Sequence, residues 1–464
     1  MTKSDIISDK TRTLIFVNII ISCIATSLLS TALTTALPPI TVDFHISSST
    51  GQWLTSAYSL VMAIMMPLTA FLITRISTRK LYISILSIFL VGTGICIIAP
   101  NFFVLMIGRI FQACSNGVTS SIAQVILLSI YPIEKRGTIM GWYGLSIGAA
   151  PIIAPTLAGI IVDSFGWRMI FVCSFVIMLI SVIYACLVMK DVIETTIKKF
   201  DVVSFLLSAT AFGGLTLGIG NASQGITSYM FICPLLIGVV GGIFFVYRQL
   251  HLSHPFLEIK VFKNFQFSLS VFNSMILYFI MMGSSILLPL YIQNILGYSA
   301  TISGLVTLPG SLVMAFVGPI AGKIYDKLGM RKLAITGAIG LFIGTLGMFL
   351  LTIDTPVVVT AILNVIRNIA IGCFMMPLVT WGISDLNEKY TADGTALLNS
   401  LRTMAGAMGT ALFVGIMNLV ASQVGGYHAD FLGLRFAFGI MSIIAVIMFV
   451  VAILLIKDKK SKNY

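Results

Sequence analysis

Three arginines lie within long apolar stretches of the sequence. Arg402 has no arginine counterpart in the first half of the chain and ranks third, whereas the other two form sets with polar amide side chains within two helical turns. These sets are Arg109 with Gln112 and Asn116, and Arg367 with Asn364 and Asn368. Residues three or four apart share one face of a helix, so each set forms a polar surface. Arginine within a membrane is costly and marks a functional site by default. The sets predict substrate-binding groups in a cavity. The alternative is that each arginine binds the backbone of a neighbouring helix.

Hydroxyl and amide side chains also recur at helical spacing in two other apolar stretches. The first stretch carries Asn18, Ser22, Thr26, Ser30 and Thr34, and the second carries Ser270, Asn273, Ser274 and Tyr278. A polar stripe has no reason to face lipid. Each stripe therefore either lines a cavity or joins helices together, and cavity lining is the prediction.

The composition says which elements must position these residues. Of 464 residues, 58% are apolar and only 9% are charged. Soluble domains carry roughly 25% charged residues, which excludes a cytosolic globular protein, and the high apolar content excludes disorder. The net charge of +12 comes from basic residues scattered between apolar runs, so no nucleic-acid partner is predicted.

The chain contains fourteen apolar runs long enough to cross a bilayer, for which about 20 residues are needed. Together they predict an all-α integral membrane protein with no room for a soluble domain. The runs cover residues 14–37, 53–74, 81–99, 103–128, 139–161, 169–189, 203–220, 230–247, 266–290, 301–322, 333–352, 356–379, 395–420 and 433–456.

The distribution of basic residues gives the orientation. If the N-terminus is cytoplasmic, 23 of the 28 Lys and Arg residues fall in cytoplasmic segments, and only Arg168 and Arg435 fall outside. Such an asymmetry is the positive-inside rule, and an extra or missing helix would scramble it. The sequence therefore predicts a multi-pass protein of the cell membrane with both ends cytoplasmic.

The first third of the chain recurs in the last. Three landmarks repeat at offsets of 252, 258 and 257 residues: Arg79-Lys80 with Arg331-Lys332, Arg109 with Arg367, and Gly137-Thr138 with Gly394-Thr395. Transporters are often built from such repeats. The expected organisation is a six-helix bundle at residues 1–190, a two-helix insertion at 191–262 and a second six-helix bundle at 263–464.

Several segments match sequence patterns of known transporters. They are the loop Gly322–Lys332, the pattern Leu105-x-x-x-Arg109-x-x-Gln112, the run from Gly144 through Pro155 to Gly159, the pair Gln52-Trp53 followed by Tyr58, Gly166-Trp167-Arg168, and Leu288–Leu308. In these segments the chain resembles the major facilitator superfamily, and it is similar from end to end to the fourteen-helix drug:proton antiporter branch that includes lincomycin-type exporters.

This resemblance implies a function and a set of partners. The expected activity is multidrug efflux by alternating access, with small amphipathic drugs and protons as partners, in a lipid bilayer and as a monomer. It also implies that the first and ninth helices line the substrate cavity. Tyr58 is predicted to be a further cavity residue. No cofactor is expected.

The loop after the tenth helix contains one acid among several bases. Asp326 with Arg331 and Lys332 can form charge-assisted contacts that latch neighbouring helices in one gating state, and Arg79 is the basic counterpart in the first repeat. That repeat has Thr74 at the acidic position, so the second-repeat latch is expected to matter more.

The fifth helix is rich in glycine and proline. Glycine permits close helix approach, and proline removes a backbone hydrogen bond and kinks a helix. A bending hinge beside the cavity is predicted, with plain packing as the alternative. Its residues are Gly144, Gly148, Pro151, Pro155 and Gly159.

No carboxylate lies in the middle of any predicted span. The resemblance implies an aspartate nine residues before the proline of Ala36-Leu37-Pro38, but that position holds Leu29. A buried carboxylate is the natural proton carrier. Asp43 and Asp163, at the outer ends of the first and fifth helices, are the nearest substitutes.

Two other functions stay open. One is export of an endogenous anionic or lipid-like metabolite, driven partly by the membrane potential. The other is a membrane-embedded enzyme, which would need His, Asp, Glu or Cys clustered at one interface. The four histidines are split between the two sides, so an enzyme is not expected.

Overall fold

The computed structural model describes residues 8–193, 195, 200–221, 228–253, 255–425 and 428–457. Within these ranges the chain forms fourteen α-helices, two short 3₁₀ segments and one π-helical turn, and no strand. The α-helices are α1 (Asp9–Asp43), α2 (Ser48–Arg75), α3 (Thr78–Ile97), α4 (Phe102–Ile130), α5 (Ile133–Phe165), α6 (Arg168–Val188), α7 (Val202–Gly220), α8 (Tyr229–His251), α9 (Phe265–Leu290), α10 (Ala300–Leu328), α11 (Met330–Phe349), α12 (Val357–Ser384), α13 (Thr391–Val424) and α14 (Ala429–Leu454). The short segments are η3 (Ile259–Lys263), η4 (Tyr291–Ile295) and η5 (Glu388–Tyr390).

Each predicted span coincides with one of these helices, which confirms the all-α membrane fold. Thirteen helices within the described residues are long and apolar enough to cross a bilayer. The remaining helix, α5, is 33 residues long. Several helices extend beyond the predicted runs because polar side chains cap them. Ser8 and Asn101, for example, accept hydrogen bonds from the backbone amides of Thr11 and Val104, and so begin α1 and α4.

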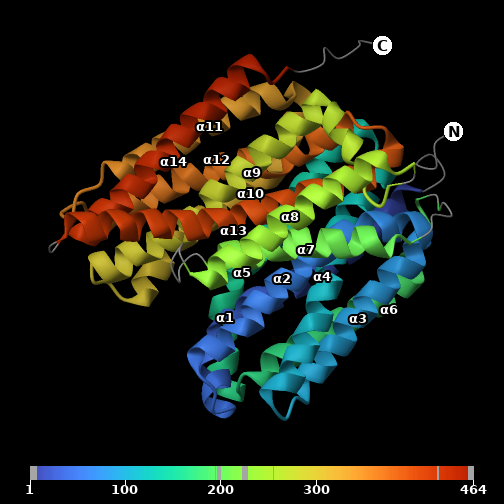
Figure 1. Ribbon diagram of the computed structural model, residues 1–464, viewed down its shortest axis with the longest axis horizontal. Helices are drawn as coiled ribbons and strands as arrows, with labels where there is room; N and C mark the ends of the chain where they lie inside the picture. Colours follow the sequence, from blue (N-terminus) through green and yellow to red (C-terminus); the bar gives the residue numbers. More distant parts are fainter. Residues whose placement is uncertain are drawn as a thin grey trace.

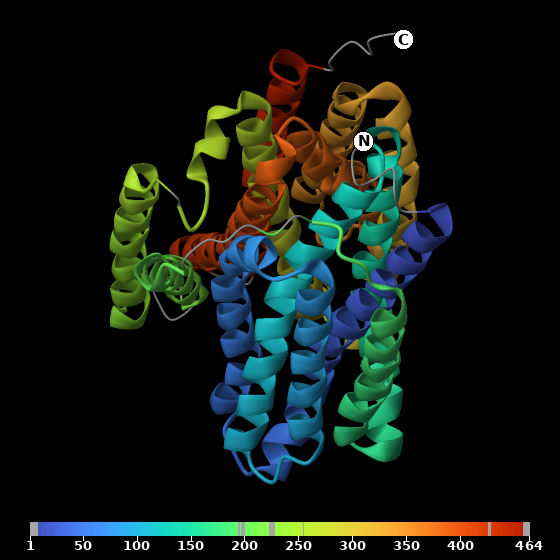
Figure 2. The same cartoon turned by 90° about the vertical axis from the view of Figure 1, so that its right-hand side faces the viewer.

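Helices α1–α6 form one group and α9–α14 a second. We call the end of the molecule where α1 begins and α14 ends the tail face, and the opposite end the far face. In Figure 1 the two groups come together on the side where both termini lie and run apart toward the other side. Figure 2 shows the same arrangement from the side, with both termini at the top.

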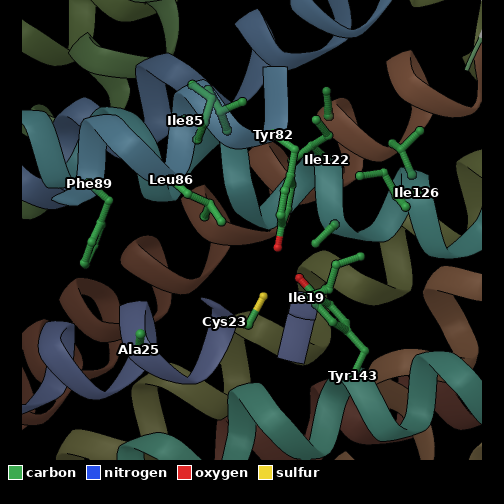
Figure 3. Packing of buried hydrophobic residues seen from close by; sticks show 14 of the residues in the cluster. Ile19, Cys23, Ala25, Tyr82, Ile85, Leu86, Phe89, Ile122, Ile126 and Tyr143 are labelled. Atoms are coloured by element: carbon green, nitrogen blue, oxygen red, sulfur yellow. The ribbon is translucent and has the colours of Figure 1, made fainter. Parts of the chain in front are cut away.

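The apolar core reflects this arrangement. One cluster of buried side chains fills the first group, and Figure 3 shows part of it, with the rings of Tyr82 and Tyr143 pointing toward Cys23. The same cluster continues into the tail-face ends of α9, α12 and α13 through Phe267, Met376 and other residues. A second cluster lies wholly within the second group. Apolar burial therefore joins the groups at the tail face.

The helices α7 and α8 pack closely on each other beside the two groups (Figure 2). Glycines at their contact, such as Gly214 and Gly238, allow the two backbones to approach within van der Waals distance. Helix α7 also packs against α2 of the first group and α13 of the second. The inserted pair thus touches both groups through α7.

Candidate functional site

Arg109 is the centre of a hydrogen-bonded network inside the first group. Its Nε donates to the backbone oxygen of Leu54 at 3.3 Å, and its Nη1 donates to Gln112 Oε1 at 2.8 Å. Its guanidinium lies 4.1 Å from the centre of the Tyr58 ring, and Asn116 Nδ2 donates to the Tyr58 hydroxyl at 2.8 Å. Arg109 is 1% exposed. The network therefore joins α2 and α4 and fits the alternative in which the arginine binds a neighbouring backbone.

Arg367 occupies the corresponding place in the second group but is less completely paired. Its Nη2 donates to Asn364 Oδ1 at 2.7 Å, and Asn368 Nδ2 donates to the same oxygen at 2.9 Å. Asn364 Nδ2 in turn donates to the backbone oxygen of Thr307 in α10 at 3.4 Å. Arg367 Nε is buried without a partner among the described residues. Both predicted sets are therefore brought together, each within its own group.

The polar stripe of α1 does not behave as a single surface. Asn18 Nδ2 donates to the backbone oxygen of Ser181 in α6 at 2.8 Å, and the Ser22 hydroxyl shares a 2.7 Å hydrogen bond with that of Tyr82 in α3. In this conformation these buried residues join helices of the first group, which is the alternative given for the stripe. Thr26 is also buried, with its hydroxyl bonded to its own helix, whereas Ser30 is half-buried and Thr34 is exposed.

The stripe of α9 lies at a different contact. Asn273 is buried and donates to the Leu269 backbone oxygen of its own helix. Tyr278 is half-buried, and its ring lies 4.8 Å from the guanidinium of Arg402 in α13. Of the predicted α9 residues, Tyr278 is thus the one placed against a charged group.

Arg402 has more weight in the structure than its sequence context suggested. It is 7% exposed, and its Nε and Nη1 are buried without a partner among the described residues. One turn earlier on α13, Asn399 Nδ2 lies 3.4 Å from Ser121 Oγ and from Gln124 Oε1, both in α4. Sequence reasoning missed Gln124, a single amide in a long helix. It also missed Asn399, although Asn399 precedes Arg402 by three residues, the spacing of Asn364 before Arg367 that could have identified it.

Asp326 binds the other group rather than its own loop. Its Oδ1 accepts the backbone amide of Gly137 at 2.8 Å, and its Oδ2 accepts the amide and the hydroxyl of Thr138 at 2.7 and 2.6 Å. Gly329, with φ of 77°, ends α10 one turn later. Asp326 thus fastens the tail-face end of α10 to the tail-face end of α5.

The basic residues predicted as partners of Asp326 make other contacts in this conformation. Arg331 Nη2 donates to the backbone oxygen of Ile453 at 3.3 Å, and Lys332 is exposed. Arg79 donates through its amide to Asp191 and through Nη2 to the Cys186 backbone oxygen, both within the first group. The acid is satisfied by backbone amides, which are stronger partners than solvated bases because they are fixed in place.

Glycines make the α5–α10 contact possible. A Cβ on Gly137 would lie 2.7 Å from the backbone oxygen of Gly322, and one on Gly322 would overlap the oxygen of Gly137. Gly141 and Gly318 meet one turn further in. Toward the far face, nothing lies within 4 Å of a Cβ position at Gly159 of α5 or Gly304 of α10. The close backbone contacts that glycines allow between α5 and α10 therefore lie toward the tail face.

The predicted hinge residues lie within one continuous helix, α5. Gly144 packs against Met376 of α12, and Gly148 lies in ordinary contact with Met314 of α10. The side chains of Pro151 and Pro155 are outside the described residues. Gly144 and Gly148 are thus packing positions in this conformation.

Neither substitute for the missing acid lies between the two groups. Asp43 Oδ2 accepts hydrogen bonds from Trp167 Nε1 at 3.1 Å and Arg168 Nη1 at 3.0 Å at the far face. Asp163 is exposed at the far-face end of α5. Leu29, at the position where the resemblance implies an aspartate, lines an apolar cavity of about 110 Å³ between α1, α5 and α6.

One buried carboxylate was not predicted as a site residue. Asp393, two residues into α13, is 4% exposed and accepts the backbone amide of Glu258 at 3.1 Å. It precedes the Gly394-Thr395 landmark of the repeat, which is the signal that could have identified it. Asp393 ties the connector before η3 to the second group at the tail face.

Comparison with known proteins assigns the family. Residues 16–410 match the family model described as Major Facilitator Superfamily. The chain is 38% identical over 436 residues to the "Uncharacterized MFS-type transporter YcnB" of Bacillus subtilis, covering 93% of this chain and 92% of that protein. It is 36% identical over 390 residues to the "Lincomycin resistance protein LmrB" of the same organism, covering 83% and 81%.

The fold gives the same answer. A solved structure of the proton:xylose symporter XylE aligns with a TM-score of 0.68 at 14% identity, covering 97% of each chain, and shows the fold alone. The chain belongs to the major facilitator superfamily, a family of transporters rather than enzymes. Within that family it is related to the fourteen-helix drug exporters.

Proposed function

We propose that this protein exports amphipathic compounds across the cell membrane by alternating access. The observation that carries the proposal is the one-sided contact between the groups, with Asp326 on Gly137 and Thr138 at the tail face, while the groups run apart toward the far face (Figure 1). Such a contact is one end state of a transporter that opens alternately to the two sides. The relation to a lincomycin resistance protein favours drugs as substrates.

The positive-inside asymmetry supports a cytoplasmic tail face. The structure is then the outward-facing state, with the cytoplasmic side closed by the α5–α10 contact. In this proposal residues 1–190 and 263–464 are the two moving bundles, residues 191–262 are the insertion, and one monomer is the working unit. The relationship to drug exporters favours proton antiport as the driving force, with Asp43 and Asp163 as the proton-binding candidates.

A second candidate is export of anionic compounds driven by the membrane potential. The observation that favours it is Arg402, a buried cation without a carboxylate at its depth. A negative-inside potential drives an anion outward by about 2.3 kcal/mol per charge per 100 mV, or roughly a fiftyfold gradient. No proton carrier is then needed.

The test is uptake of lincomycin and of the neutral dye N-phenyl-1-naphthylamine into inside-out proteoliposomes, with a pH gradient and a potential imposed separately. Antiport predicts accumulation with an acidic lumen alone, and its loss in the variant carrying both Asp43→Asn and Asp163→Asn. The anion 8-anilinonaphthalene-1-sulfonate is tested in parallel, and its accumulation by a lumen-positive potential alone, also in that double variant, supports the second candidate. If neither gradient drives accumulation of either compound, the efflux proposal is wrong.

A further inference from the structure

The three arginines inside the helical bundle differ in how their donors are used. Arg109 donates to two acceptors and stacks on an aromatic ring, and Arg367 donates to Asn364. For Arg402, the described residues offer no acceptor to Nε or Nη1, although the residue is 93% buried. Its one contact of note is the face of the Tyr278 ring.

An unpaired guanidinium inside a membrane protein is among the most unfavourable arrangements a side chain can adopt. Buried polar groups are nearly always hydrogen-bonded, so each exception calls for a ligand, a water or a function. Two more unpaired atoms belong to Asn399, one turn before Arg402 on α13, and to Gln124, which faces Asn399 from α4. They are Gln124 Nε2, a donor, and Asn399 Oδ1, an acceptor.

These side chains lie where the two groups of helices meet. Arg402 and Asn399 come from α13, Tyr278 from α9 and Gln124 from α4. Arg402 is eleven residues from the start of α13, roughly 16 Å along the helix.

We propose that Arg402, Gln124 and Tyr278 form a subsite for the oxyanion of an amphipathic substrate, a carboxylate or sulfonate next to an aromatic or alkyl body. The planar fork of arginine matches such groups with two parallel hydrogen bonds. The Gln124 amide supplies a third donor, and the Tyr278 ring holds the guanidinium from its face. Asn399 Oδ1 is left to accept from a hydroxyl or amine of the substrate. This subsite rests on the proposed export function.

The test uses two dyes with the same aromatic skeleton. These are 8-anilinonaphthalene-1-sulfonate, which carries the oxyanion, and neutral N-phenyl-1-naphthylamine, which lacks it. Saturable binding to the full chain in nanodiscs of phosphatidylcholine is measured by fluorescence against empty nanodiscs, and uptake is measured in proteoliposomes. The variants are Arg402→Gln, Arg402→Lys and, as a control arginine at the far face, Arg435→Gln, which loses a bond to the Phe349 backbone oxygen.

We expect Arg402→Gln to lower the affinity for the sulfonate relative to the neutral dye by about tenfold to a hundredfold, the usual weight of a charge-assisted contact. Arg402→Lys should restore part of that ratio, and Arg435→Gln should leave it as in the wild type. An unchanged ratio in Arg402→Gln, or an equal loss of both dyes, overturns the subsite. Sulfonate binding that depends on Arg402 without uptake of either dye supports the subsite and contradicts the efflux proposal.

Thermal unfolding separates a binding role from a structural one. Because two donors of Arg402 have no partner to lose, Arg402→Met should leave the melting temperature unchanged or raise it by a few degrees. Added sulfonate dye should raise the melting temperature of the wild type and not that of Arg402→Met. A marked fall in the melting temperature of Arg402→Met would show that the residue holds the fold, and would overturn the proposal.

Discussion

The contact between α5 and α10 and the contact between α2 and α13 occupy corresponding places in the two repeats, but they are built differently. Between α5 and α10, glycines bring the backbones together and Asp326 binds two amides across the groups. At the corresponding point of α2, Thr74 bonds only to the Phe71 backbone oxygen of its own helix.

The partner side differs as well. Gly394, the counterpart of Gly137, packs against Leu386 and Phe267 of its own group instead of against α2. In compensation, α7 packs along both α2 and α13, with Gly213 close to Ile64 of α2. The first contact is thus fastened by a specific acid, and the second is covered by an inserted helix. Two contacts related by a repeat can therefore contribute unequally to closing one face of the protein.

The largest expected effect comes from forcing the first contact apart. In Gly322→Ala the new Cβ overlaps the backbone oxygen of Gly137, and a backbone cannot rotate away as a flexible side chain can. Such overpacking costs about 3 kcal/mol or more. It therefore reduces the population of the state in which the tail face is closed by roughly a hundredfold. Uptake of N-phenyl-1-naphthylamine by proteoliposomes should be nearly abolished.

The matched control is Gly304→Ala, on the same helix but with nothing within 4 Å of the added Cβ. It should transport as the wild type does and insert equally well. Equal transport by Gly322→Ala and Gly304→Ala would show that the close backbone approach is not needed.

An intermediate effect is expected when the acid alone is removed. Asp326→Asn replaces an oxygen that accepts from Thr138 with a group that donates, so charge-assisted bonds worth about 1.5–3 kcal/mol are lost. Transport should fall by about tenfold or more, and the amides of Gly137 and Thr138 should exchange hydrogen for deuterium faster.

Asp354→Asn, an exposed acid at the far face, serves as the control and should change neither quantity. Normal amide exchange in Asp326→Asn at equal expression would remove Asp326 from its role as a latch.

Much of the fold follows from the sequence because one physical requirement dominates it. A helix that crosses a bilayer must be apolar over its whole length, so the fourteen spans were visible in composition alone. The ends of the helices were harder to predict, because side-chain caps such as Ser8 and Asn101 extend helices into the polar loops. The repeat also identified both arginine sets, and each set is assembled within its own group.

The partners of individual side chains did not follow from the sequence. Asp326 was expected to pair with the bases beside it, yet it binds backbone amides 189 residues away. Backbone amides leave no mark in a sequence, whereas basic residues do. The same limit applies to the polar stripe of α1. Periodicity identifies the polar face of a helix, but it does not say whether another side chain, such as Tyr82, or a cavity lies opposite that face. The sequence likewise did not show that Arg109 has hydrogen-bond partners for Nε and Nη1 in the folded protein and that Arg402 does not.

The smallest expected effect tests whether an acid alone can create the missing latch. Thr74→Asp places a carboxylate on α2 where the repeat has Asp326 on α10. Gly394 of α13, the counterpart of Gly137, packs against Leu386 and Phe267 of its own group rather than against α2. The new acid is therefore solvated, and surface charges of this kind contribute about 1 kcal/mol or less. Transport should stay within about twofold of the wild type, and the melting temperature within about two degrees.

Combined with Asp326→Asn, Thr74→Asp should not restore transport. Rescue of transport in that double variant would instead show that the α2–α13 contact can take over the latch, and that the two contacts differ only in which one carries the acid.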